Sequence, residues 1–235
     1  MPGDDEQSRE QLQRDVASLL LSVIGPDGFA LAGACAIREH ALTDRTTADV
    51  DLFGPPLTTV DQFGTIVRRA EDALKGADYT VERLRTFDQF ARLRVTKGRG
   101  PVLDIDLALN WRSEPPVQLA VGPVLSERDA VAGKLSAVYS RGEIRDFLDL
   151  DAIRSSGRWS DDVLLDLGRE HDEGFDVGMF AEQLSRVATY LPSEAAVYGI
   201  SEDDLLAAKA RLLAWASELR DRTQPPSAGG PDGES

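Results

Sequence analysis

The pattern of apolar residues changes near residue 125, and this change limits the folds open to the chain. Before it, alternating segments typical of strands are interleaved with helical periodicity, and after it only helical periodicity remains. Strand patterns lie at residues 29–33, 48–53, 79–84, 90–96, 102–109 and 117–121, and helical patterns at 9–24, 34–41, 60–75, 129–139, 145–154, 160–170, 175–187 and 202–222. We therefore expect an α+β core over residues 9–125, a helical C-terminal subdomain over 126–222, and disordered ends at 1–8 and 223–235.

Composition narrows the chemistry that such a chain can perform. The 235 residues carry a net charge of −15, so general binding to nucleic acid through electrostatics is disfavoured and no DNA partner is expected. Cys35 is the only cysteine, and His40 and His171 are the only histidines, which argues against a disulfide framework and a Cys- or His-rich metal site. No run approaches 18 apolar residues and the N-terminus is acidic, so we expect a cytoplasmic protein without a membrane partner.

The most informative short segment is the predicted strand at residues 48–53, which ends at a Gly-Pro-Pro exit. Asp49 and Asp51 are two residues apart, so both carboxylates point to the same face of this strand. Like charges at that spacing repel unless a cation lies between them, and carboxylate oxygens suit Mg²⁺ or Mn²⁺. Asp104 and Asp106 form a second such pair, and one of them could complete a three-carboxylate metal site if the two strands are neighbours. Solvated acidic strand faces are the alternative interpretation for both pairs.

Two further features could contact phosphate groups. Gly33 and Ala34 lie where a short apolar run meets a predicted helix, a place where backbone N–H groups can approach an anion. Basic residues gather in one region of the predicted sheet, at Arg83, Arg85, Arg92, Arg94, Lys97 and Arg99. If their strands are adjacent, these side chains would present a positive face to an RNA backbone, and a role in solubility is the alternative.

These motifs in this order resemble the AbiEii/AbiGii-type nucleotidyltransferase-like toxins, a group that includes the MenT toxins. The resemblance begins with Gly33-Ala34, a helix, and Arg45-x-Thr47-x-Asp49-x-Asp51-Leu-Phe. It continues with a helix that carries Lys134 and then the segment Arg145-Asp146-x-x-Asp149-Leu, so that it spans roughly residues 28–155. The chain departs from the family pattern at Ala34 and Cys35, where the family often has a hydroxyl residue.

The resemblance implies a fold and residue roles. The fold would be the polymerase-β-like nucleotidyltransferase core, a mixed sheet with a C-terminal helical subdomain. Asp49 and Asp51 would hold Mg²⁺ or Mn²⁺ and the phosphates of an NTP. Lys134 and Asp149 match the catalytic Lys and Asp of the family. Phosphate contacts would come from Gly33, Ala34, Arg45, Thr47 and Asp146.

The implied activity is transfer of nucleotides from an NTP to an acceptor. The expected acceptor is the 3′ end of tRNA, whose modification would block translation and growth, and a cognate antitoxin would restrain the protein. Two alternatives remain open at this point. The chain could be a degenerate, non-catalytic module that binds nucleotide or protein, or a transferase that acts on a protein or small-molecule hydroxyl.

Overall fold

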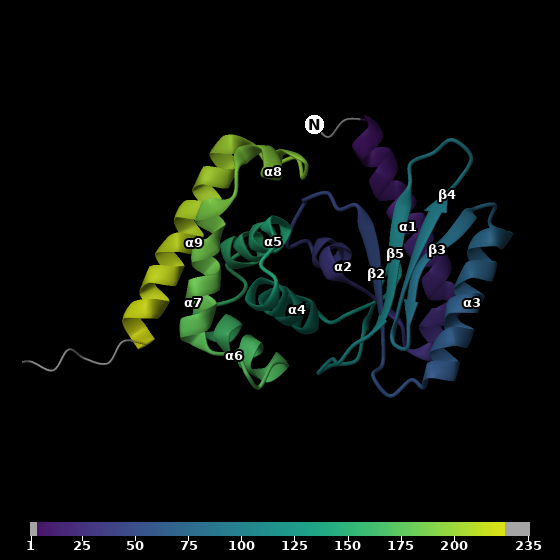
Figure 1. Ribbon diagram of the computed structural model, residues 1–235, viewed down its shortest axis with the longest axis horizontal. Coiled ribbons are helices and arrows are strands. Elements are labelled where there is room, and N and C mark those ends of the chain that lie inside the picture. The colour runs from purple at the N-terminus through teal and green to yellow at the C-terminus, as the bar shows by residue number, and fades with distance from the viewer. Residues whose placement is uncertain (1–3, 224–235) are drawn as a thin grey trace, which may run out of the picture.

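The computed structural model describes residues 4–223, which form a mixed sheet followed by a helical half (Figure 1). The strands are β1 (Ala30–Ala32), β2 (Asp49–Gly54), β3 (Thr80–Phe87), β4 (Phe90–Thr96), β5 (Leu103–Leu109), β6 (Val117–Leu119) and β7 (Gly122–Val124). The helices are α1 (Asp4–Ile24), α2 (Gly33–Glu39), α3 (Val60–Gly76), α4 (Glu127–Ser140), α5 (Ile144–Ser155), α6 (Asp161–His171), α7 (Val177–Ser185), α8 (Pro192–Ala196) and α9 (Glu202–Thr223), with 3₁₀ turns η1 (Gly25–Asp27) and η2 (Arg186–Thr189). The α+β expectation is confirmed.

The sheet has the strand order β3-β4-β5-β2-β1-β7-β6. β2 runs parallel to β5, β1 runs parallel to β7, and the other neighbouring pairs are antiparallel. Helices α1 and α3 cover one face, and α2 and α4 lie on the other side, toward the helical half (Figure 1). The two central strands β2 and β5 are therefore flanked on both faces, which explains their buried apolar residues.

Helix α3 illustrates how local sequence builds the covered face. Thr59 caps its first turn, because the hydroxyl oxygen accepts from the N–H of Gln62 while the Gln62 side chain accepts from the N–H of Thr59. Five apolar side chains on one side of the helix are buried, namely Phe63, Ile66, Val67, Ala70 and Leu74. This is the face that the helical periodicity predicts.

One hydrophobic cluster runs through both halves of the structure. It contains Val50 and Ile105 of the sheet together with Leu135, Phe180 and Trp215 of the helices. The sheet ends at Val124 and α4 begins at Glu127, close to the predicted change at residue 125. Among the helices of residues 4–223, none combines the length and hydrophobicity that a membrane span requires.

Several element boundaries differ from those that the sequence pattern indicates. Residues 4–8, expected to be disordered, are helical at the start of α1, and Thr223, assigned to the tail, ends α9. The other residues of the two expected disordered ends, 1–3 and 224–235, lie outside the described chain. Of the predicted strand at 117–121, only residues 117–119 form a strand, β6, which makes a hairpin with β7. The helix predicted at 175–187 is the shorter α7 followed by η2. Three-residue strands are too short for alternation to reveal them.

Candidate active site

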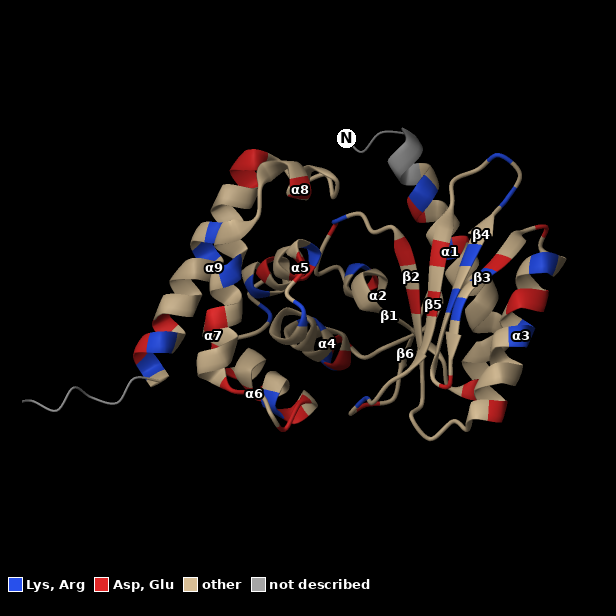
Figure 2. Cartoon of the chain, in the orientation of Figure 1, with Lys and Arg blue, Asp and Glu red and all other residues tan. Residues whose placement is uncertain are grey.

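The register of the central strands brings the two acidic pairs together. β2 pairs with β5 so that Asp49 lies beside Asp104 and Asp51 beside Asp106. Val50 and Ile105, which alternate with these acids, are fully buried on the opposite face. All four carboxylates therefore belong to one face of the sheet, and three of them, Asp49, Asp51 and Asp106, line a cavity with Lys134 of the helical half. Figure 2 shows the acidic bands of β2 and β5 side by side.

The next strand neutralises the second pair. Arg92 of β4 lies opposite Asp106 and donates from Nε to Oδ1 at 2.6 Å, with a second bond from the other side of the guanidinium. Arg94 lies opposite Asp104 in the same way, at 2.7 and 2.9 Å. These hydrogen bonds to Arg94 hold the pKa of Asp104 below its ordinary value. Asp106 lines the candidate site, whereas Asp104 is turned to Arg94 and does not.

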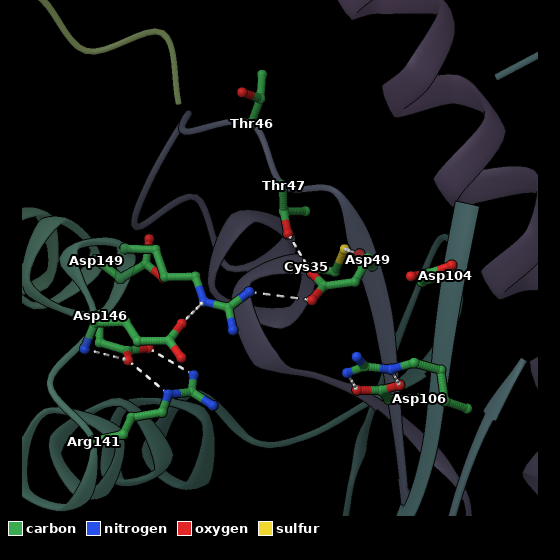
Figure 3. A network of polar contacts seen from close by, with 12 residues as sticks. Cys35, Thr46, Thr47, Asp49, Asp104, Asp106, Arg141, Asp146 and Asp149 are labelled. Atoms are coloured by element: carbon green, nitrogen blue, oxygen red, sulfur yellow. Dashed lines mark hydrogen bonds and ion pairs between the residues drawn. The ribbon is translucent and has the colours of Figure 1, made fainter. Parts of the chain in front are cut away.

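The negative charges of the first pair, Asp49 and Asp51, are balanced by fewer neighbouring cations. Asp49 accepts a hydrogen bond from the Thr47 hydroxyl at 2.7 Å and lies 3.3 Å from Arg145 Nη1 (Figure 3). Among residues 8–223, whose side chains the structure describes, no side chain or backbone N–H donates a hydrogen bond to the Asp51 carboxylate. Burial, and then the charges of Asp49 and Asp106, raise the pKa of Asp51 to about 7. A carboxyl group in this state favours a proton or a cation beside it.

Gly33 makes room for Asp51 at the start of α2. Its φ is +58°, a left-handed conformation, and a Cβ added there would lie 1.8 Å from Asp51 Oδ2. Ala34, the next residue, lines a small cavity between the sheet and the helices α4 and α5. Cys35 is buried and its thiol lies 3.5 Å from the carbonyl oxygen of Asp49, with a pKa that burial raises to about 12. The thiol is therefore an inert packing group here.

Lys134 approaches the same place from α4. The side chain is buried, and its Nζ lies 2.8 Å from Asp149 Oδ2 and 3.8 Å from Asp146 Oδ1. Arg45, in the α2–β2 loop, donates two hydrogen bonds to the Asp149 carboxylate, at 2.7 and 2.9 Å. Burial opposes ionisation of Asp149, but Lys134 and Arg45 outweigh it and lower its pKa. The charged form of Asp149 is thus favoured, both of its oxygens are already bound, and its position suits it to orient Lys134 and Arg45.

Asp146 has a similar place one helical turn earlier. It is fully buried, and its two oxygens accept from Arg141 at 2.8 and 2.9 Å (Figure 3). Neither Asp146 nor Asp149 lines the cavity, although they share a face of α5 as their spacing predicts. Arg145, which lies between them in sequence, pairs with Asp49 and Glu143 and not with Asp149.

These groups enclose a small cavity of about 80 Å³ between the sheet and α4 and α5. Its lining consists of Ala34, Arg45, Thr47, Asp49, Asp51, Arg92, Asp106, Lys134, Arg141 and Arg145. Five cationic side chains and three carboxylates line the cavity, and the buried carboxylates of Asp146 and Asp149 behind the lining supply the other two negative charges. Such a lining suits an anion bound together with a cation. The structure thus brings most of the predicted site residues together; Gly33 contacts the site from behind Asp51.

Arg92, Arg141 and Arg145 are cavity residues to which sequence reasoning gave no role in the site. Arg141 and Arg145 flank the turn between α4 and α5, and Arg92 belongs to the basic region of the sheet. For Arg141 and Arg145 the available signal was their closeness to Asp146 and Asp149 along the chain, and for Arg92 it was the alternation of its strand. Neither signal says which face of an element points toward the site.

A second, larger cavity adjoins the first. Its volume is about 1080 Å³, and it lies between α1, the α2–β2 loop, α5 and the α8–α9 connection. Arg45 and its neighbour Thr46 line it, and the guanidinium carbon of Arg45 lies 5.1 Å from the ring centre of Tyr198. Arg45 thus forms part of the wall of both cavities.

The donor set can be tested for a divalent cation. Asp49 and Asp51 supply hard oxygen ligands, and the raised pKa of Asp51 marks a negative charge that a cation would relieve. Across the described part of the chain, no three His, Cys, Asp or Glu side chains are grouped so as to hold a metal ion. Asp106 is occupied by Arg92. The residues therefore fit an ion held by two carboxylates and completed by substrate phosphates and water, as is usual for Mg²⁺.

Comparison with known proteins identifies the family. The family described as "Nucleotidyl transferase AbiEii toxin, Type IV TA system" matches residues 17–214, so the chain belongs to it. JHP933 from Helicobacter pylori shares 16% identity over 94% of both chains, with a TM-score of 0.55. MenT4, a nucleotidyltransferase toxin from Mycobacterium tuberculosis H37Rv, shares 17% identity over 93% of this chain and 86% of that one, with a TM-score of 0.53. The sequence matches no curated protein.

Family membership confirms the resemblance that the sequence motifs indicate. The protein is a nucleotidyltransferase toxin with the nucleotidyltransferase fold. A toxin family of this kind implies an antitoxin partner and an NTP substrate.

Proposed function

We propose that the protein transfers nucleotides from an NTP to the 3′ end of an RNA, with tRNA as the expected acceptor, in a reaction that depends on Mg²⁺ or Mn²⁺. The observation that carries this proposal is the convergence of Asp49, Asp51, Lys134 and four arginines on one cavity. An NTP brings several phosphate negative charges and a divalent cation, and this lining offers a partner to each. A cation bound by Asp49 and Asp51 would withdraw negative charge from the phosphates.

The chain's own residues do the positioning. Lys134, Arg45, Arg141 and Arg145 line the cavity and would donate N–H groups to a triphosphate bound there. The Thr47 hydroxyl donates to Asp49 and fixes its orientation. Asp149 and Asp146 hold three of these cations in place before substrate arrives, so that little reorganisation accompanies the reaction. The acceptor hydroxyl attacks the α-phosphorus and gives up its proton to a carboxylate of the cavity or to water. The bond from the α-phosphorus to the bridging oxygen breaks, and pyrophosphate leaves. The adjoining 1080 Å³ cavity is large enough for a nucleoside.

The proposal is tested by incubating the protein with each labelled NTP, Mg²⁺, total RNA and a protein extract. We expect label in RNA, loss of labelling with chelator, and loss in Asp49→Ala. The control is Asp162→Ala, which removes a carboxylate of α6 with 73% side-chain exposure. Labelling that survives Asp49→Ala contradicts the proposed site. Label in protein instead of RNA contradicts the proposed acceptor, and nucleotide binding without any labelling supports a non-catalytic module.

A further inference from the structure

The hairpin of β3 and β4 carries an exposed aromatic pair. Phe87 and Phe90 flank its two-residue turn and are direct cross-strand partners. Their ring centres are 6.4 Å apart. Phe87 is 65% exposed and Phe90 is partly exposed. Single exposed apolar residues are common, but two contacting rings on a sheet face form a surface that can bind something.

The pair lies on the same face of the sheet as the catalytic carboxylates. Phe90 is two residues before Arg92, which lies opposite Asp106, and Asp106 lies beside Asp51. Residues two apart share a face, and the intervening Ala91 is fully buried on the other side. Two strand spacings across and two residues along place Phe90 about 12 Å from Asp51. A short stretch of extended chain could bridge that interval.

Positive charge accompanies the rings. The Arg92 guanidinium carbon lies 5.9 Å from the centre of the Phe90 ring, and Arg85 lies directly opposite Arg92 on β3. Arg85 is exposed and forms no ion pair with any of the side chains that the structure describes, those of residues 8–223. Figure 2 shows bands of Lys and Arg on β4 beside bands of Asp and Glu on β5. On a chain of net charge −15, an uncompensated arginine beside two open rings favours an anionic, aromatic ligand.

We propose that Phe87 and Phe90 stack the unpaired bases at the end of a single-stranded RNA, that Arg85 contacts its phosphates, and that the terminal hydroxyl reaches the Asp106 side of the cavity. This inference rests on the proposed RNA acceptor and names the surface that holds it. Aromatic rings stack on any base, so the platform provides affinity with little dependence on sequence. RNA with unpaired ends is the class that proteins read in this manner.

The direct test measures binding of a fluorescent single-stranded oligoribonucleotide by anisotropy, without NTP. We expect Phe87→Ala and Phe90→Ala each to weaken binding at least about fivefold, the lower end for loss of one stacked base. Phe87→Leu, which keeps apolar area but removes the ring, should also weaken it, whereas Phe87→Trp should retain it. Leu206→Ala, at a 55% exposed position of α9, should leave it unchanged. Arg85→Ala should reduce the slope of log affinity against log salt by about 0.7.

The outcomes separate this inference from the proposed function. In the transfer assay, the phenylalanine variants should raise the KM for RNA and leave the KM for NTP unchanged. If RNA is labelled but folded Phe87→Ala and Phe90→Ala bind it as the wild type does, the platform is wrong and the transferase stands. If no RNA is labelled but the oligonucleotide binds through these rings, the platform stands and the proposed acceptor reaction fails. Failure of the wild type to bind any oligonucleotide overturns the platform.

Discussion

At the scale of single residues, Gly33 is a position where a side chain has no room. Gly33→Ala adds a Cβ 1.8 Å from Asp51 Oδ2 in a backbone of φ +58°. The left-handed conformation alone costs about 1–2 kcal/mol for an L-residue, and the clash adds to it. We expect the melting temperature to fall by several degrees and transfer activity to be lost, because the carboxylate must move. Thermal unfolding and the labelling assay measure the two effects.

Gly133 of α4 supplies the matched control. A Cβ there meets no atom within 4 Å, so Gly133→Ala should stabilise the helix by about 0.5–1 kcal/mol. The two glycine variants should therefore shift the melting temperature in opposite directions. Equal shifts would contradict the close approach of Gly33 to Asp51.

The pKa of Asp51 makes a prediction about pH. A carboxyl whose pKa rises from about 3.9 unfolded to about 7 folded binds its proton more tightly in the native state. Its contribution to stability is complete below about pH 4 and disappears as the pH rises through about 7. Asp51→Asn removes this loss, so in chelator the melting temperature of the variant should exceed that of the wild type more at pH 8 than at pH 5.

Added Mg²⁺ provides the second measurement at Asp51. An ion that binds only the native state raises the melting temperature, and the rise should be larger for the wild type than for Asp51→Asn at pH 8. If, in chelator, the difference in melting temperature between the wild type and Asp51→Asn is the same at pH 5 and pH 8, the raised pKa of Asp51 is contradicted.

The sequence could predict which residues reach the site but not how their charges pair. Asp49, Asp51 and Lys134 were found because each belongs to a motif that is local in the chain. The pairing of Arg92 with Asp106 depends on the register between β4 and β5, which a shift of two residues would change without altering either sequence pattern. Burial of Asp149 behind Lys134 likewise depends on how α5 packs against α4. From the sequence alone, Phe87 and Phe90 could be buried core residues or surface residues. The structure places them on the sheet face that carries the acidic pairs, with Phe87 exposed.

At the scale of secondary structure elements, the ion pairs of α5 join three segments. Asp149 holds Lys134 of α4 and Arg45 of the α2–β2 loop, and all three side chains are buried. Asp149→Ala would remove the nearest carboxylate from two buried positive charges, and breaking a buried ion pair costs about 3–5 kcal/mol. We therefore expect a fall in stability in addition to the loss of activity, measured by urea unfolding.

A double-mutant cycle tests whether this network acts as a unit. Lys134→Met removes one of the two positive charges that Asp149 balances. Asp149→Ala should therefore lower the free energy of unfolding less in the Lys134→Met background than in the wild type. A coupling of about 1–3 kcal/mol is expected for residues in such a network. Additive losses would indicate that Asp149 and Lys134 act independently and that the 2.8 Å contact contributes little.

At the scale of the whole molecule, the succession of strand and helix patterns predicts the fold class. It does not predict the order of the strands in the sheet. β1 lies between β2 and β7, which is more than 60 residues further along the chain than β2. Only packing of the assembled sheet selects that neighbour. The boundary near residue 125 is visible in sequence because helical periodicity replaces alternation there, yet periodicity does not tell whether two halves share a core.

The shared core predicts that the two halves unfold together. Leu135, Phe180 and Trp215 belong to the same hydrophobic cluster as Val50 and Ile105, and a fragment ending at residue 125 would expose the sheet surface that the helices cover. We expect calorimetry of the full chain to give one transition whose calorimetric and van't Hoff enthalpies agree. The fragment should lack the cooperative transition and bind a hydrophobic dye. Two separate transitions would instead mean that the candidate site, whose side chains come from both halves, is assembled by docking of independent domains.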